Sequence, residues 1–275
     1  MPPEPLRLLI LAAHPDDAEI SSGGLAAIYR SLGHSVKIVS VTNGEAGHHE
    51  TVGPALTSRR RGEAAASAKV IGAVSEVWDF PDGRIQPTLE LRYRIIREIR
   101  QERPDLVVTH RNNDYHPDHR AVGDAVRDAS YMVTVPALVS DVPIVDKEPV
   151  VAFMPDLFTK PYPLQPDVIV DISRQLDTIT EMLACHKSQF FEWLPYNRRE
   201  LSDVPRGDAG RKHWLKDKLI ERFAQRTQRF WPATVAAYGE AAARNIPFIE
   251  PYEISEYAGR LTPERRRELF PFVPQ

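Results

Sequence analysis

The 275-residue sequence contains a single cysteine, Cys185, so the chain cannot form an internal disulfide. Nothing in it therefore points to an oxidising compartment. The sequence also lacks a basic excess. Its formal net charge is −3, whereas nucleic-acid-binding domains usually carry a marked positive charge. We expect no nucleic-acid partner.

Two further features are missing. The first apolar run, residues 6–13, is too short to span a membrane and has no strongly cationic segment before it. We therefore expect a soluble cytoplasmic protein without a membrane span, and a homo-oligomer is compatible with the sequence. No G-x-G-x-x-G motif follows this run, because Gly23 and Gly24 fall too far into the next helix. This absence argues against a nucleotide-binding Rossmann protein.

Strand and helix patterns alternate along the first 190 residues. Near-continuous apolar runs predict strands, and helical periodicity with glycine stops predicts the helices between them. This alternation is typical of an α/β fold with a Rossmann-like, mostly parallel sheet flanked by helices. The predicted strands are residues 6–13, 36–41, 76–80, 106–109, 150–153 and 168–170, and the predicted helices are residues 19–32, 57–71, 89–103 and 173–186.

The composition changes after Glu192, where charged and aromatic residues form helical patterns at 212–230 and 233–244. We divide the chain into a domain at residues 1–190 and a helical C-terminal extension at 191–275. Seven prolines break residues 135–166 into short extended pieces. The sequence does not reveal the role of either this stretch or the extension.

Two clusters of histidine and aspartate each follow a predicted buried strand. His14-Pro15-Asp16-Asp17 follows residues 6–13, and His116-Pro117-Asp118-His119 lies shortly after residues 106–109. Ligands of parallel α/β sheets bind at the carboxyl ends of the strands. Catalytic zinc takes three ligands from His, Asp or Glu and keeps one position for water. The two clusters therefore predict one metal site in a metal-dependent hydrolase.

These clusters and several smaller motifs resemble the LmbE-like/PIG-L family of zinc-dependent N-deacetylases. The resemblance covers about residues 5–190, and the two histidine clusters are its specific part. The smaller motifs are Asn43-Gly44-Glu45, Arg60-x-x-Glu63, Pro81-Asp82-Gly83, Pro166-Asp167-Val168 through Asp171-Ile172, and His186-x-Ser188-Gln189.

The resemblance implies a Zn²⁺ cofactor bound by His14, Asp17 and His119, with Asp16 as the general base. It gives His116 the stabilisation of the tetrahedral oxyanion and, as a cation, the protonation of the departing amine. Asp118 would orient an imidazole and favour its charged form. Alternatively, Asp118 caps the helix that starts near His119, since aspartate is a favoured N-cap.

Glu45 and Arg60 match family positions that contact the substrate's sugar hydroxyls. The fixed donor fork of arginine suits such polar substrates, but Arg60 can equally pair with Glu63 or Glu45 as scaffold. His48, His49 and His110 are candidates for lining the mouth of the site, although lone loop histidines are usually solvated. Trp193, Trp214 and Trp231 are candidates for stacking on a sugar or for packing.

The resemblance implies removal of the N-acetyl group from an N-acetylglucosamine-type sugar or glycoside. One alternative keeps the chemistry but takes a larger amide, such as a sugar or thiol conjugate. Another is a non-catalytic protein with a structural metal or a bound nucleotide. The adjacent Asp16 and Asp17 argue against a structural metal, because closed structural sites favour four cysteine-rich ligands.

Overall fold

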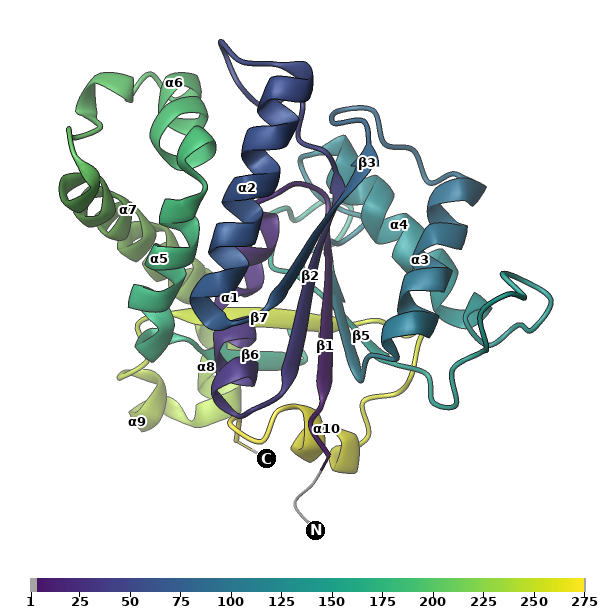
Figure 1. Ribbon diagram of the computed structural model, residues 1–275. Coiled ribbons are helices and arrows are strands. Elements are labelled where there is room, and N and C mark those ends of the chain that lie inside the picture. The colour runs from purple at the N-terminus through teal and green to yellow at the C-terminus, as the bar shows by residue number, and fades with distance from the viewer. Residues whose placement is uncertain (1–3, 275) are drawn as a thin grey trace.

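The computed structural model describes residues 4–274 and contains one seven-stranded sheet in the order β3-β2-β1-β4-β5-β7-β6 (Figure 1). All neighbouring pairs are parallel except those of β7, which runs antiparallel to both β5 and β6. The predicted fold class is confirmed. The strands are β1 (Arg7–Ala12), β2 (Ser35–Thr42), β3 (Val74–Phe80), β4 (Leu106–Thr109), β5 (Val150–Phe153), β6 (Val168–Asp171) and β7 (Ile249–Ile254).

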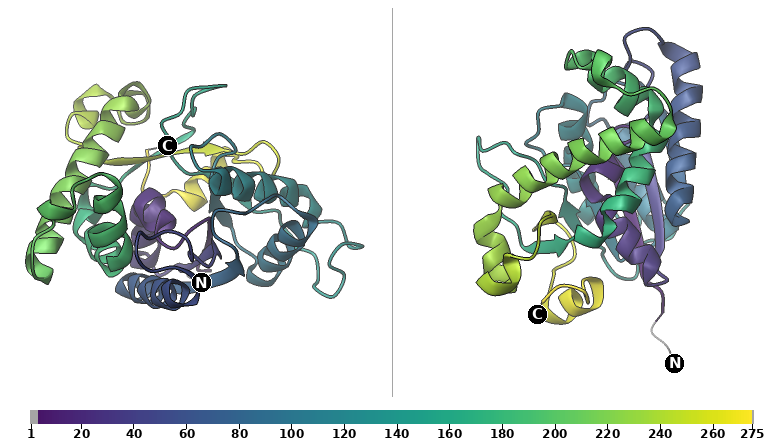
Figure 2. Two further views of the ribbon diagram at one scale, coloured as in Figure 1. Left: turned by 90° about the horizontal axis from the view of Figure 1, so that it is seen from above. Right: turned by 90° about the vertical axis from the view of Figure 1, so that its left-hand side faces the viewer.

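Helices cover both faces of the sheet (Figures 1 and 2). Alternate residues of β1 point to opposite faces, so Leu8 and Ile10 belong to one core, with α1, α5 and α7, and Leu9 and Leu11 to the other, with α3 and α4. These helices are α1 (Asp17–Ser31), α2 (Gly53–Ile71), α3 (Leu89–Glu102), α4 (Pro117–Met132), α5 (Leu176–Cys185) and α7 (Asp208–Arg229).

The extension after residue 190 is mainly helical, as predicted, and its long helix α7 lies against α5 (Figure 2). The helix predicted at 233–244 is interrupted at Gly239, whose φ of 76° leaves the helical region and separates α8 from α9. The shorter helices are α6 (Leu194–Asn197), α8 (Trp231–Tyr238), α9 (Glu240–Ala243) and α10 (Pro263–Leu269). A π-helical turn, Gln189–Trp193, precedes α6.

The sequence analysis did not predict β7, which inserts between β5 and β6. Its buried Glu250 accepts hydrogen bonds from the backbone N–H groups of Gly24 and Leu25, both at 2.8 Å. A Cβ atom at Gly24 would overlap Ile172 and the Glu250 carboxylate. The glycine therefore serves the close approach of β7 to α1, which ties the extension into the first βαβ unit.

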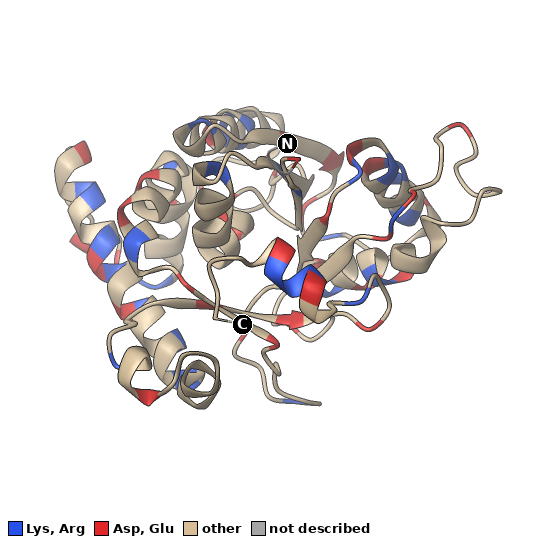
Figure 3. Cartoon of the chain, turned by 90° about the horizontal axis from the view of Figure 1, so that it is seen from below, with Lys and Arg blue, Asp and Glu red and all other residues tan. Residues whose placement is uncertain are grey.

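Acidic and basic residues are distributed over the helices and loops seen from below, and in α10 the three consecutive arginines 265–267 are flanked by Glu264 and Glu268 (Figure 3). None of the helices between residues 4 and 274 is both long and apolar enough to cross a membrane.

Candidate metal centre and pocket

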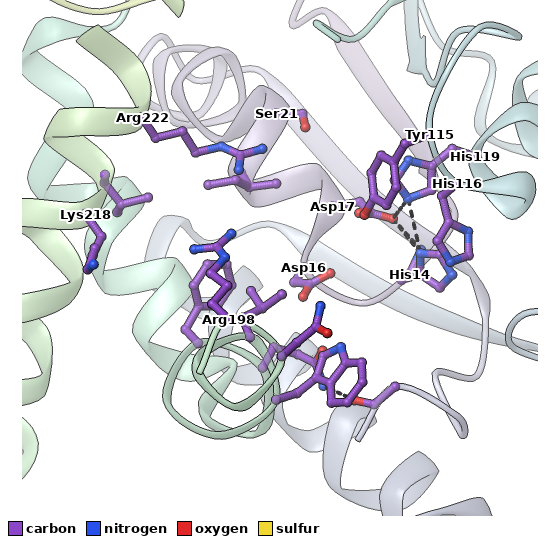
Figure 4. Close-up of a pocket in the computed structure, with 18 of the residues that line it drawn as sticks. His14, Asp16, Asp17, Ser21, Tyr115, His116, His119, Arg198, Lys218 and Arg222 are labelled. Carbon is purple, nitrogen blue, oxygen red and sulfur yellow. Dashed lines mark hydrogen bonds and ion pairs between the residues drawn. The ribbon is translucent and has the colours of Figure 1, made fainter. Parts of the chain in front are cut away.

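The two His/Asp clusters meet at the carboxyl ends of β1 and β4 (Figure 4). His14 follows β1, and His116 immediately precedes α4, the helix that carries His119. The sheet order changes direction here, because β2 lies on one side of β1 and β4 leads on to β5 on the other. Open parallel sheets bind their ligands in the crevice at such a switch point. The predicted position of the site is therefore where the fold favours a ligand.

Three side-chain atoms in this crevice form a nearly equilateral triangle. His14 Nδ1 and His119 Nε2 lie 3.1 and 3.2 Å from Asp17 Oδ2, and the two nitrogens are 3.3 Å apart. Tetrahedral zinc holds N and O ligands at about 2.0–2.2 Å, so its ligand atoms stand about 3.3–3.6 Å apart. The triangle therefore fits a metal ion of this kind, and its chemistry is that of a catalytic rather than a cysteine-rich structural site.

The other ring nitrogen of each histidine is held by carboxylates. His14 Nε2 lies 3.1 Å from Asp82 and 3.2 Å from Asp118, and His119 Nδ1 lies 3.0 Å from Asp114. Metal-binding histidines usually donate this second N–H to such a group, which fixes the tautomer and the ring orientation. In the tautomer that binds a metal, His14 Nδ1 and His119 Nε2 would therefore present their lone pairs to the ion.

Asp17 is ionised in this setting. Burial alone would raise the pKa of its carboxyl, but His119 and His14 beside it hold that pKa well below the usual range. His14 and His119 each belong to two of three overlapping groups that offer possible metal ligands. These groups are His14, His116 and His119; Asp17, His110 and His119; and His14, Asp82 and Asp118.

Asp16 occupies the sharp turn between β1 and α1, with a φ of 128° that non-glycine residues rarely adopt. Such backbone strain is often found at functional sites. The side chain lines the pocket and makes no hydrogen bond among the described residues, and its nearest cation is Arg60 Nη2 at 3.7 Å. Burial raises the pKa of Asp16 to about 6, although Arg60 opposes the shift. Asp16 is therefore positioned and tuned to exchange a proton.

Arg60 is 2% exposed and supports the turn that carries the first cluster. Its guanidinium donates to the carbonyls of Gly44 at 3.2 Å and Pro15 at 2.8 Å. It also reaches the pocket wall, but these bonds favour a scaffold role. Its acidic neighbours among the described residues are Asp16 and Asp82, not the predicted Glu63 or Glu45. Glu45 is not among the pocket-lining residues, so its predicted contact with substrate has no support in the structure.

Asp118 does not cap α4, because it lies inside the helix and the N-cap is His116. The backbone N–H of Asp118 donates to His116 Nδ1 at 3.2 Å, while the Asp118 carboxylate orients His14 and accepts from the Gly83 N–H at 2.7 Å. Burial and the neighbouring His14 and His119 lower the pKa of His116, and Asp118 offsets this only in part. Asp118 therefore orients the imidazole of His14, as expected, and although burial opposes the shift, Asp17 and Asp118 raise the pKa of that ring. The cationic role of His116 stays a prediction.

His110 is not a solvated loop histidine, because its side chain is buried; it lines the pocket, which was the other alternative. His110 Nε2 accepts the Ala13 N–H at 2.9 Å, and its ring stacks on His119 with centroids 3.9 Å apart. Burial lowers the pKa of His110 to about 4, which keeps it neutral. His48 is buried against Glu192 at 3.0 Å and is not solvated either.

The pocket has a volume of about 730 Å³ and two unlike walls. One wall carries the His/Asp clusters, and the other comes from residues that follow the first domain. Pockets of about 300–1,000 Å³ accommodate ligands the size of a drug molecule or a disaccharide. The second wall includes Trp193, Leu194, Arg198, Trp214, Lys218 and Arg222, and residues 154–158 form part of the rim.

The sequence analysis missed Asp82, Asp114 and the second wall as parts of the site. Asp82 lies in a motif that the family resemblance includes, and Asp114 stands only two residues before His116, so both had a weak signal. No sequence signal indicated Lys218 and Arg222, because the pattern of an amphipathic helix does not show which part of the structure its basic residues face.

Comparison with known proteins places these features in a family context. A family model described as PIG-L, GlcNAc-PI de-N-acetylase, matches residues 9–130. The diacetylchitobiose deacetylase of Thermococcus kodakarensis is 30% identical over 207 residues, which cover 70% of this chain and 75% of that protein. The 4-oxalmesaconate hydratase of Pseudomonas putida is 26% identical over 198 residues, covering 69% and 76%.

A solved structure of similar fold is that of the 4-carboxy-2-hydroxymuconate hydratase from Pseudomonas putida. It superposes with a TM-score of 0.72 at 21% sequence identity and covers 94% of this chain and 98% of that one. The similarity extends over the C-terminal extension as well as the first domain.

Proposed function

Because the chain belongs to the PIG-L family of de-N-acetylases, we propose that it is a zinc-dependent hydrolase that removes the N-acetyl group from an N-acetylglucosamine-type sugar or glycoside. The ligands are His14, Asp17 and His119. The observation that carries this proposal is the triangle of their three facing atoms, which lie 3.1–3.3 Å apart. Asp16, whose backbone φ is 128°, is the residue next to Asp17.

His14, Asp17 and His119 would hold the zinc ion, which would supply an activated water near neutral pH and polarise the amide carbonyl. Asp16 accepts a proton as the water oxygen bonds to the acetyl carbon. The amide then cleaves at its C–N bond, and the proton held by Asp16 passes to the departing nitrogen. The products are acetate and a free amine. The pKa of about 6 suits both directions of this transfer near neutrality.

His116 stabilises the oxyanion as a neutral hydrogen-bond donor. Its Nδ1 accepts the Asp118 backbone N–H at 3.2 Å, so the proton of the neutral ring resides on Nε2. A preorganised N–H directed at the developing oxygen charge stabilises the transition state without any change of protonation. The lowered pKa of His116 is consistent with this role.

Replacing His116 with alanine should lower kcat by roughly 10²–10³-fold, the usual cost of losing one oxyanion donor. His116→Gln should recover part of this loss, because its amide N–H reaches about as far as Nε2. Metal content and kcat should be measured for both variants. Near-normal turnover in His116→Ala would remove His116 from the mechanism, and a glutamine variant as poor as alanine would favour a cationic histidine.

The proposed activity is tested by acetate release from a panel of N-acetylated substrates. The panel comprises N-acetylglucosamine, diacetylchitobiose, an N-acetylglucosaminide with a bulky aglycone, and an acetylated thiol conjugate. Release from the larger substrates alone would select the conjugate-amidase alternative, which the volume of about 730 Å³ accommodates. No release from any of them, by protein that contains metal, would contradict the proposal.

A hydratase is the second candidate. The similarity to the 4-oxalmesaconate hydratase covers about as much of the chain as the similarity to the deacetylase, and the basic residues of the second wall suit a carboxylated substrate. A hydratase adds water across a carbon–carbon double bond, so loss of ultraviolet absorbance from a carboxylated diene, with no acetate release from amides, would favour it.

A further inference from the structure

Four basic residues approach the pocket from the wall opposite the metal centre. Lys218, Arg222 and Arg226 recur every four residues along α7 and therefore share one face of that helix. Arg198 reaches the same space from the end of α6 (Figure 4). All four line the pocket that contains Asp16 and Asp17.

Two of these cations already have partners. The Nζ atom of Lys218 lies 3.3 Å from Glu200, so its charge is largely compensated. Arg226 is buried, donates to the carbonyls of Ile20 and Ile249, and lies over the Phe223 ring. We therefore interpret both residues as structural parts of the pocket wall and not as ligand-binding residues.

The guanidinium groups of Arg198 and Arg222 have no such partner. Within residues 4–274 the structure gives neither side chain a hydrogen bond or an ion pair, and Glu221, which also lines the pocket, is not paired with them. Desolvation and then the charge of Arg198 lower the pKa of Arg222, while Tyr115, Asp17 and Asp16 act in the opposite direction. The two arginines thus repel each other. Both side chains are exposed to solvent at the pocket wall, and both guanidinium groups keep all their donors free of protein partners.

Arginine pairs that keep their donors free at a pocket wall suit a bound anion, because the planar fork matches the oxygens of a carboxylate or phosphate. We propose that Arg198 and Arg222 form an anion subsite, and that the substrate carries a carboxylate or phosphate group at the end distant from the bond that is cleaved. The inference rests on the proposed function only in taking this pocket as the substrate site.

Binding by the metal-loaded protein is measured calorimetrically with three probes that have no acetamide: glucose, glucuronate and glucose 6-phosphate. At least one anionic sugar should bind roughly 10- to 100-fold more tightly than glucose, the range expected for charge-assisted hydrogen bonds. The probe with the greater preference identifies the carboxylate or the phosphate as the natural group. Equal affinity for all three sugars, or no measurable binding, would overturn the subsite.

Arg222→Gln and Arg198→Gln should each reduce the ratio of anionic to neutral affinity by about 10-fold. Arg229→Gln is the matched control, because Arg229 is exposed on the same helix and does not line the pocket; its ratio should equal that of the wild type. A preference that survives both pocket variants would mean that the anion binds at the metal instead, and would overturn the proposal.

These measurements use probes without an acetyl group, so they do not depend on deacetylation. Absence of acetate release with intact anion selectivity would contradict the proposed function and leave the subsite standing. Acetate release without anion selectivity would support the proposed function and contradict the anion subsite.

Discussion

Protein carrying His119→Ala should purify almost free of divalent metal and lose essentially all activity. Removing a carboxylate that merely orients a metal-binding histidine already costs about 10–100-fold in metal affinity or activity. His119 contributes an atom to the triangle itself, 3.2 Å from Asp17 and 3.3 Å from His14. Its loss leaves two ligands and should therefore cost considerably more.

Elemental analysis of protein purified without added metal provides the measurement. Wild-type protein should contain about one ion per chain, as three-ligand sites do, and His14→Ala should resemble His119→Ala. His213→Ala is the control, because His213 is exposed on α7 and its nearest acidic partner is Asp217 at 3.6 Å. Unchanged metal content in both site variants would contradict the ligand assignment.

The adjacent residues Asp16 and Asp17 should respond to the same substitution in opposite ways. Asp16→Asn should retain its metal but lose roughly 10²–10⁴-fold in turnover, the usual contribution of a positioned general base. Asp17→Asn should lose metal, because its carboxylate oxygen is the atom that faces both histidines. We expect this difference because Asp17 contacts both histidines, whereas the nearest charged partner of Asp16 is Arg60.

Metal content and kcat measured on both asparagine variants decide this prediction. If Asp16→Asn turns over at a near-normal rate while fully loaded, another group must accept the proton. If both variants lose metal equally, the division between base and ligand is wrong and the two carboxylates act together on the ion.

The sequence predicted the two His/Asp clusters, which follow the carboxyl ends of β1 and β4. An apolar run such as that of β1 identifies a buried strand, and the residue leaving its carboxyl end has little freedom. His14 and His119 were therefore found to meet, although 105 positions separate them. The roles of Asp16 and His116 remain predictions for the kinetic experiments above.

The features that the sequence did not reveal depend on tertiary packing. Strand β7 contains Glu250 and Pro251, residue types that argue against a central strand. It forms because β5 and β6 pair with its backbone, and because the Gly24 and Leu25 N–H groups donate hydrogen bonds to the Glu250 carboxylate. His110 looked like a loop residue for the same reason, since nothing in the chain order indicates that it stacks on His119.

The two walls of the pocket are encoded in separate stretches of the gene. The metal centre and Asp16 fall within residues 9–130, whereas the arginines of the opposite wall fall between 198 and 226. Substitutions between residues 198 and 226 can therefore change one wall of the pocket without altering the residues of the other.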